Sequence, residues 1–264
     1  RSLIMKEWVL ILGCSTGHGG ATARKLAENG YGIIGFHFDR GEIKKQAEQL
    51  CEDLSALNGG RVHFFNKNAA DMDVMKEFVP KINDITNGEK LKLFLHSIAF
   101  GTTTNFFGER PVTQKQMEMT VHVMGTSILY WVQLLFEDKL LGQGSRVLGL
   151  TSEGNYLCME GYGPVSVAKV ALESITRQIG WELGKHGITA NCIQAGITPT
   201  RALTKITENW EEWVKKTEKR NPMGRTTEPN DVASVVDLLL QPAADFINCS
   251  IVYTDGGEHR SGSF

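Results

Sequence analysis

Two hydrophobic periodicities alternate along most of the chain. Short, nearly continuous apolar runs predict buried strands at 8–12, 32–37, 61–66, 91–96, 146–151, 189–194 and 250–254. Apolar residues at helical spacing predict helices at 21–29, 42–57, 74–86, 114–136, 164–185 and 231–240. Strands that alternate with helices are typical of a parallel sheet covered on both faces. We therefore expect an α/β protein with a doubly wound parallel sheet of about seven strands.

Glycine and proline support these boundaries. Gly30 and Gly187 follow predicted helices, and Pro164 suits the first turn of a helix, where its missing N–H costs nothing. No linker, repeat or low-complexity segment interrupts the 264 residues. The whole chain, 1–264, is thus predicted to form one domain.

A glycine-rich loop, Gly13-Cys14-Ser15-Thr16-Gly17-His18-Gly19, joins the first predicted strand to the first helix. Unpaired N–H groups at such a helix N-terminus bind the pyrophosphate of a dinucleotide. The loop predicts a Rossmann-type dinucleotide site, with Gly13, Thr16, Gly17 and Gly19 at the cofactor. Because glycine turns between strands and helices are common, this loop is a weak signal until other residues support it.

Tyr162 and Lys169 supply that support. A phenol has an ordinary pKa near 10, and a neighbouring ammonium favours the phenolate and lowers that pKa. The same ammonium can bind the hydroxyl groups of a cofactor ribose. The two residues are seven apart, so two helical turns would return nearly to the same face, but a helix that starts at Pro164 leaves Tyr162 just outside it. We expect Tyr162 and Lys169 to be the catalytic residues of a nicotinamide-dependent oxidoreductase.

The glycine loop, this pair and the segment Ala168-Lys169-Val170-Ala171-Leu172-Glu173 resemble the short-chain dehydrogenase/reductase family. Ordinary members place the tyrosine four residues before the lysine, where this chain has Val165. The seven-residue offset, and His96-Ser97-Ile98-Ala99 after the fourth strand, resemble the enoyl-acyl-carrier-protein reductases of that family. The resemblance implies reduction of an enoyl thioester, with Tyr162 at the thioester carbonyl and Lys169 at the ribose.

The resemblance also assigns positions around the cofactor. The Ala195–Thr200 turn would face the nicotinamide, with the Thr198 backbone at the carboxamide and the Thr200 hydroxyl at a phosphate. Asn68 and Ala69 would face the adenine, although an aspartate is more usual at position 68. The remaining expected cofactor positions are Ser97, Ile98, Thr151, Ala195 and Gly196.

Some positions depart from the enoyl reductase pattern. Its second aromatic residue, nine or ten before the tyrosine, is replaced here by Glu153 and Ser152. Tyr156 is near but off register, so it would line the acyl pocket or be a loop aromatic. His122 stands where ordinary members have an asparagine, and a packing role is expected for it. Ser152 aligns with the serine that binds the substrate oxygen in ketone reducers, which leaves a carbonyl reductase as the alternative.

Residues at the end of the second predicted strand bear on the choice between NADH and NADPH as cofactor. A carboxylate there would accept the ribose 2′-hydroxyl of NAD and repel a 2′-phosphate. The strand tip is His37, followed by Asp39 and Arg40. Arg40 at the ribose would favour NADPH through a charge-assisted contact, and Asp39 would favour NADH. The missing carboxylate at His37 favours NADPH.

Composition excludes several classes. The 28 basic and 30 acidic side chains are nearly balanced, so no nucleic-acid partner is expected. Apolar runs too short to span a bilayer predict no membrane insertion, and five scattered cysteines fit a reduced, cytoplasmic protein.

An acyl thioester on acyl carrier protein or CoA is the expected partner, no metal site is expected, and resemblance suggests a homotetramer. The region of about 197–220 would form a substrate lid. A non-catalytic nucleotide-binding protein is a further alternative, because His122 and the missing second aromatic are off pattern.

Overall fold

The computed structural model describes residues 5–206 and 209–262. Within them, seven strands form one sheet in the order β3-β2-β1-β4-β5-β6-β7, and every neighbouring pair is parallel. The strands are β1 Trp8–Leu12, β2 Gly32–His37, β3 Val62–Asn66, β4 Leu91–His96, β5 Arg146–Ser152, β6 Thr189–Ala195 and β7 Ile251–Thr254. This confirms the predicted seven-stranded, doubly wound sheet.

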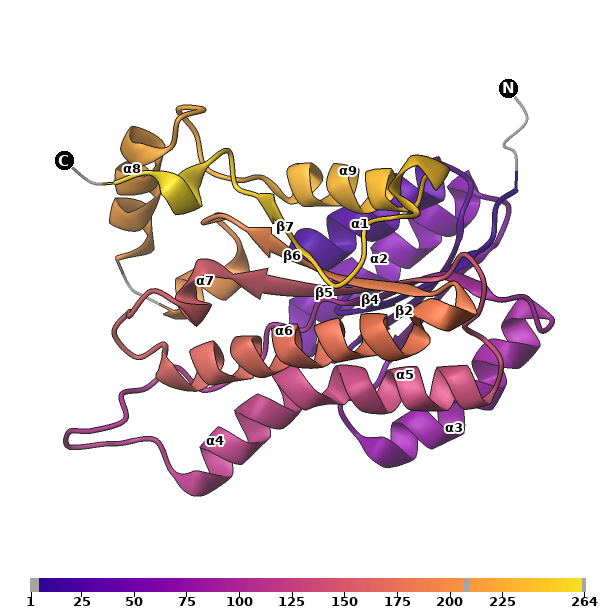
Figure 1. Ribbon diagram of the computed structural model, residues 1–264, viewed down its shortest axis with the longest axis horizontal. Coiled ribbons are helices and arrows are strands. Elements are labelled where there is room, and N and C mark those ends of the chain that lie inside the picture. The colour runs from indigo at the N-terminus through magenta and orange to yellow at the C-terminus, as the bar shows by residue number, and fades with distance from the viewer. Residues whose placement is uncertain (1–4, 207–208, 263–264) are drawn as a thin grey trace.

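Helices cover both faces of the sheet (Figure 1). On one face lie α1 Gly17–Glu28, α2 Gly41–Leu57 and α9 Pro229–Leu239, and on the other lie α3 Met72–Thr86, α5 Ser127–Glu137 and α6 Gly163–Leu183. The shorter helices are α4 Gln114–Val121, α7 Arg201–Ile206 and α8 Trp210–Arg220. Single turns occur at η2 Glu153–Asn155, η3 Gly184–His186, η4 Pro242–Ala244 and η5 Glu258–Arg260.

Alternation along the strands divides the interior into two cores. In β1, Leu10 and Leu12 pack in the core beneath α3, α5 and α6, whereas Val9 and Ile11 pack in the core beneath α1, α2 and α9. Successive side chains of a strand point to opposite faces of the sheet, so a strand that is apolar at every position has buried side chains on both faces. The continuous apolar runs of the sequence therefore match a sheet that is covered on both sides.

The predicted helix at 114–136 is interrupted. Residues His122–Thr126 form a π-helical segment, η1, between α4 and α5. A Cβ on Gly125 would lie 2.8 Å from the Ala168 carbonyl oxygen, so the π segment lies tightly against α6. The wider turn changes the hydrogen bonding without changing the apolar spacing enough to be visible in the sequence.

The same continuous stretch, Gln114–Glu137, is long and apolar enough to cross a membrane by length and composition. Our expectation that all apolar runs are too short is therefore wrong for this helix. Half of its most apolar window is buried inside the protein, and the core helix of a globular protein passes the same test. The finding is weak evidence for a membrane span.

Strand order reverses between β1 and β4, and ligands of doubly wound sheets bind at the carboxyl ends of the strands at such a point. Helices α7 and α8 lie near this edge, outside the two helical layers (Figure 1). They occupy most of the predicted lid, of which residues 207 and 208 lie outside the described residues.

Candidate active site

The glycine loop leads from β1 directly into α1, which begins at Gly17, four residues before the predicted start. Gly13 has φ +85°, and a Cβ on Gly19 would lie 1.9 Å from the Gly13 carbonyl oxygen, so both positions require glycine. Thr16, at the N-cap, makes no side-chain capping bond, and the first turn has no acidic residue. No side chain therefore caps the N–H groups of this turn, and a helix N-terminus of this kind suits an anion.

Tyr162 is the N-cap residue of α6, as the position of Pro164 predicted. Its side chain is 6% exposed, and its hydroxyl lies 2.8 Å from the Ser152 Oγ at the end of β5. A Cβ on Gly154 would lie 2.2 Å from the tyrosine ring, so that glycine makes room for the ring. Burial raises the pKa of Tyr162, while the hydrogen bond from Ser152 opposes the rise and the nearby Glu153 adds to it. The phenol therefore stays protonated at neutral pH.

Lys169 lies two turns into α6, where it is buried and donates a hydrogen bond of 2.7 Å to the Leu150 carbonyl oxygen. Burial lowers the pKa of its ammonium to about 8. We expected the ammonium to lower the pKa of the Tyr162 phenol, but burial of the ring is the larger effect and raises it. In this structure the lysine is positioned on the β5 backbone rather than on the tyrosine.

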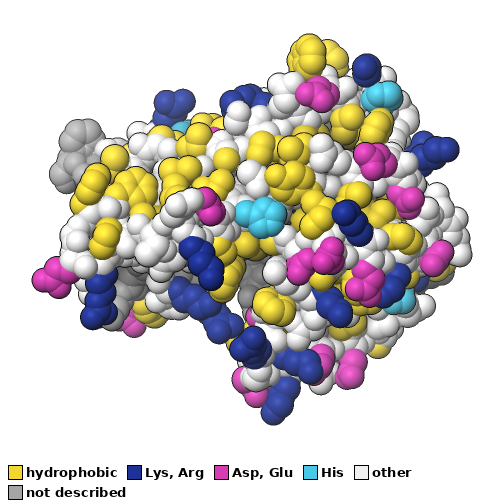
Figure 2. Space-filling model, turned by 90° about the horizontal axis from the view of Figure 1, so that it is seen from below, with side chains coloured by type: hydrophobic (Ala, Val, Ile, Leu, Met, Phe, Trp, Pro, Cys, Tyr) yellow, Lys and Arg dark blue, Asp and Glu magenta, His cyan; other side chains and the backbone are white. Residues whose placement is uncertain are grey.

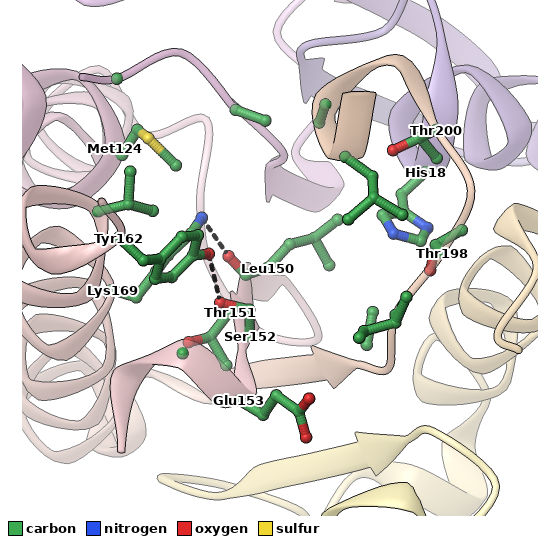
Figure 3. A pocket seen from close by; sticks show the side chains of 18 of the residues that line it. His18, Met124, Leu150, Thr151, Ser152, Glu153, Tyr162, Lys169, Thr198 and Thr200 are labelled. Atoms are coloured by element: carbon green, nitrogen blue, oxygen red, sulfur yellow. Dashed lines mark hydrogen bonds between the residues drawn. The ribbon is translucent and has the colours of Figure 1, made fainter. Parts of the chain in front are cut away.

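A cavity of about 280 Å³ lies beside these two residues (Figure 3). The predicted residues that line it are Ser97, Ile98, Thr151, Ser152, Tyr162, Lys169, Ala195, Gly196, Thr198 and Thr200. Apolar residues that sequence reasoning did not single out also line it: Phe100, Met124, Met159, Val165, Ile197, Leu203 and Trp213. The cavity therefore joins a polar end near the glycine loop to an apolar pocket.

Tyr156 is not among the residues that line this cavity. It follows the turn Glu153–Asn155, and Gln194 Nε2 donates a hydrogen bond of 3.0 Å to its hydroxyl. The side chain is 49% exposed. These contacts favour the alternative of a loop aromatic, and a role for Tyr156 at the substrate stays a prediction.

The expected adenine side lies beyond the cavity, at the ends of β2 and β3. His37 is buried and its Nδ1 lies 3.1 Å from the Asp39 carboxylate, while Arg40 is exposed at the N-cap of α2. The turn at Asn68 and Ala69 is buried at Ala69, whose carbonyl accepts a 2.7 Å hydrogen bond from Trp131 Nε1.

His122 supports the same turn. Its Nε2 donates a 2.7 Å hydrogen bond to the Ala70 carbonyl oxygen, and its Nδ1 lies 3.3 Å from the Thr126 hydroxyl. The π segment thus positions this side chain against the adenine-side turn. The packing role expected for His122 agrees with these contacts.

A charged cluster joins the cavity rim to α8. Arg220, the last residue of α8, donates hydrogen bonds to Glu153 at 2.7 Å and to Glu258 at 2.8 Å. Both carboxylates are buried, and burial together with Glu153 raises the pKa of Glu258. This cluster could not be predicted from the sequence, because Arg220 is 67 residues from Glu153 and 38 from Glu258.

A glycine loop before a helix N-terminus, a buried tyrosine and lysine, and a cavity at the strand ends of a Rossmann-type sheet are the features of a nicotinamide-dependent oxidoreductase. Among residues 5–206 and 209–262, no group of three or more His, Cys, Asp or Glu side chains is placed to hold a metal ion. The family model described as Enoyl-(Acyl carrier protein) reductase matches residues 13–259, so the chain belongs to this family within the short-chain dehydrogenases/reductases.

Individual proteins show the same relationship at low identity. The chain is 28% identical to the enoyl-[acyl-carrier-protein] reductase [NADH] FabI of Bacillus subtilis over 90% of this chain and 89% of that one. It is 22% identical to the (2S)-[(R)-hydroxy(phenyl)methyl]succinyl-CoA dehydrogenase subunit BbsD of Thauera aromatica, over 96% and 97%. The crystal structure of FabI from Candidatus Liberibacter asiaticus superposes with a TM-score of 0.85 at 22% identity, covering 99% and 98%. The relatives at this level of identity thus include an enoyl-[acyl-carrier-protein] reductase and a dehydrogenase subunit.

Proposed function

We propose that this NAD(P)H-dependent oxidoreductase reduces the 2,3-double bond of an enoyl thioester, with Tyr162 and Lys169 as its catalytic residues. The observation that carries the proposal is the position of Tyr162. It lies at the N-cap of α6, seven residues before Lys169, with a protonated phenol beside an apolar pocket. An acyl chain suits that pocket, and a phenol suits the oxygen that gains charge during reduction.

The bound nicotinamide would supply a hydride to the β-carbon of the enoyl group. The electron pair of the double bond then moves toward the thioester carbonyl, and the Tyr162 hydroxyl donates a hydrogen bond to the enolate oxygen. A proton added at the α-carbon completes the saturated thioester. Lys169 would hold the cofactor ribose, and its 2.7 Å bond to Leu150 keeps the ammonium at a fixed place in the cavity. The glycine loop would hold the pyrophosphate at the N-terminus of α1. Its tight conformation needs glycine, because a Cβ on Gly13 would lie 2.3 Å from the Ser97 carbonyl oxygen and a Cβ on Gly19 would lie 1.9 Å from the Gly13 carbonyl oxygen.

Ser152 favours a second candidate function, reduction of a carbonyl group. Its Oγ lies 2.8 Å from the Tyr162 hydroxyl, so two hydroxyl groups can bind one substrate oxygen. Comparing crotonyl-CoA with acetoacetyl-CoA separates the two reactions, because the thioesters have equal chain length and differ in the reacting group. Consumption of NADH or NADPH with crotonyl-CoA supports enoyl reduction, and consumption with acetoacetyl-CoA alone supports the carbonyl reductase.

For the cofactor, we propose a preference for NADPH. The support is Arg40, which is exposed and makes no ion pair within the described part of the chain. The strand tip itself is His37, and the nearest carboxylate, that of Asp39, lies 3.1 Å from the His37 ring. A hydrogen bond between charged groups contributes about 1.5–3 kcal/mol, so Arg40→Ala should lower NADPH affinity roughly tenfold or more and leave NADH affinity nearly unchanged. Asp39→Ala is the matched variant. A wild type that prefers NADH and turns to NADPH in Asp39→Ala would contradict the proposal.

We further propose that the substrate is carried on acyl carrier protein or CoA, that the enzyme works in fatty-acid synthesis in the cytoplasm, and that it is a homotetramer of single-domain subunits. The support for assembly is the outer side of α6, where Val167, Val170 and Trp181 are 40%, 48% and 76% exposed. The face of the molecule on the side of α3, α5 and α6 also presents hydrophobic side chains among charged ones (Figure 2). Sedimentation of the purified protein tests the tetramer.

A further inference from the structure

The His18 side chain is an unexplained polar group inside the cavity. It is the second residue of α1, and its ring lies among the side chains that line the cavity, near Thr198 and Thr200 (Figure 3). The loop at Thr200 lies against the same helix end, since the Thr200 Cγ2 would be 3.7 Å from a Cβ on Gly17. His18 therefore lies between the N–H groups of α1 and the turn expected at the nicotinamide.

One nitrogen of the His18 imidazole has no hydrogen-bond partner among the described residues. This atom, Nδ1, is buried. A buried polar atom without a partner is costly, and such atoms in native proteins usually indicate a missing ligand or water. The ring is thus placed to bind a group that enters the cavity.

The charges that surround this ring favour an anion. Lys169 from α6 and Lys205 from α7 line the same cavity, and the only carboxylate among its described lining residues, Glu153, is bonded to Arg220. Burial, and secondly the Lys169 charge, lower the pKa of His18 to about 4. An entering diphosphate would offset both effects, because it supplies hydrogen-bond acceptors and negative charge.

We propose that the His18 imidazole binds the pyrophosphate of the nicotinamide cofactor and takes up a proton when the cofactor binds. The inference rests on the proposed place of the cofactor in this cavity. It adds a side-chain cation to the backbone N–H groups of α1, at a position of the loop where no charged residue was expected.

Linkage fixes the sign of the pH dependence. In the cofactor-free protein, a pKa of about 4 leaves His18 neutral near neutral pH. If the bound cofactor raises this pKa, the complex binds more protons than the free enzyme does. Cofactor affinity should therefore rise as the pH falls from 7 toward the free pKa. Lys169, with a pKa of about 8, stays charged in this range and does not contribute.

The test is calorimetric titration of the whole protein with NADH at about pH 6, in two buffers that differ in ionisation enthalpy. NADH is chosen because a phosphate monoester, such as the 2′-phosphate of NADPH, itself titrates near pH 6. We expect uptake of a substantial fraction of one proton per site, and affinity several-fold higher at about pH 6 than at about pH 7. His18→Gln replaces the imidazole with a neutral amide that can still donate a hydrogen bond. This variant should retain its affinity for NADH at about pH 7 within roughly threefold, but it should lose the proton uptake and the pH dependence.

His37→Gln is the matched control, because His37 is the other histidine expected near the cofactor, at its ribose end. This variant should keep the proton uptake. Uptake that disappears in His37→Gln, or that persists in His18→Gln, overturns the proposal. Wild type that binds NADH without proton uptake also overturns it, while leaving the proposed function intact; failure to bind NADH or NADPH at all would instead refute the proposed function.

Discussion

The two walls of the cavity are built differently. One wall consists of the ends of β4, β5 and β6 with the first turns of α6, where Tyr162 and Lys169 are each 6% exposed. The other wall consists of α7 and α8, which lie outside the helical layers and contribute Leu203, Lys205 and Trp213. Arg220 joins the walls through Glu153 and Glu258. The proposed catalytic groups are thus held by the sheet and α6, whereas the wall expected to act as the lid is a pair of helices outside the two layers.

Tyr162→Phe should have the largest effect. Removing the phenol oxygen deletes a donor that acts at the reacting carbonyl, so kcat should fall about 10²–10³-fold. Cofactor affinity, measured by calorimetry, should stay nearly the same, because the loss is confined to the transition state. Wild-type turnover in this variant would show that another group is the donor.

Arg220→Gln tests the link between the walls. It leaves Glu153 and Glu258 buried without their cation, and allowing for the partly exposed arginine, the free energy of unfolding should fall by roughly 2–4 kcal/mol. Urea unfolding measures this loss.

The pH dependence of that loss has a definite sign. A carboxyl whose folded pKa is raised, as that of Glu258 is, binds more protons folded than unfolded, so its ionisation removes stability as the pH rises. The Arg220→Gln variant should therefore be destabilised most at about pH 8 and least at about pH 5. Equal destabilisation at both pH values would show that the arginine does not neutralise these carboxylates.

Lys169→Met separates function from stability. We expect NADH and NADPH affinity to fall about tenfold through loss of a charged hydrogen bond to the ribose. The cofactor-free protein should nevertheless gain about 1–3 kcal/mol of unfolding free energy, because a buried charge is replaced by a buried apolar chain.

The gain in Lys169→Met also depends on pH. The lysine pKa is depressed from 10.5 to about 8 in the folded protein, so its penalty is complete below pH 8 and disappears as the pH rises toward 10.5. The gain in stability should decrease over the same range. A destabilised variant with unchanged cofactor affinity would make Lys169 a purely structural residue.

Trp213→Ala tests the helical wall and should have the smallest effect. We expect KM for a long 2-enoyl-CoA to rise several-fold with kcat nearly unchanged, because the side chain contributes apolar contact to the acyl chain alone. Trp210→Ala is the control, since Trp210 lies on the same helix but does not line the cavity. If both variants behave alike, α8 does not contact the substrate at residue 213.

The sequence predicted the sheet because uninterrupted apolar runs and short connections specify parallel strands that are buried on both faces. It also predicted the cap position of Tyr162, since Pro164 marks a helix start. The π segment at His122–Thr126 was missed because its apolar spacing reads as a continuous helix.

The residues of the candidate site could be predicted where they belong to motifs with a fixed spacing along the chain. Tyr162, Lys169 and the glycine loop belong to local motifs and were found. The pocket residues Leu203 and Trp213, and the cluster around Arg220, come together only through tertiary packing. The surroundings of Tyr156 could not be predicted, because the single turn of 3₁₀ helix that precedes it is invisible in the sequence.

The most direct test of enoyl reduction is the consumption of NADH and NADPH by the wild type with crotonyl-CoA and acetoacetyl-CoA at equal concentrations. We expect turnover of crotonyl-CoA to butyryl-CoA, little turnover of acetoacetyl-CoA, and loss of the crotonyl-CoA activity in Tyr162→Phe. Turnover of acetoacetyl-CoA without reduction of crotonyl-CoA would contradict it and make the protein a carbonyl reductase in which Ser152 and Tyr162 bind the ketone oxygen.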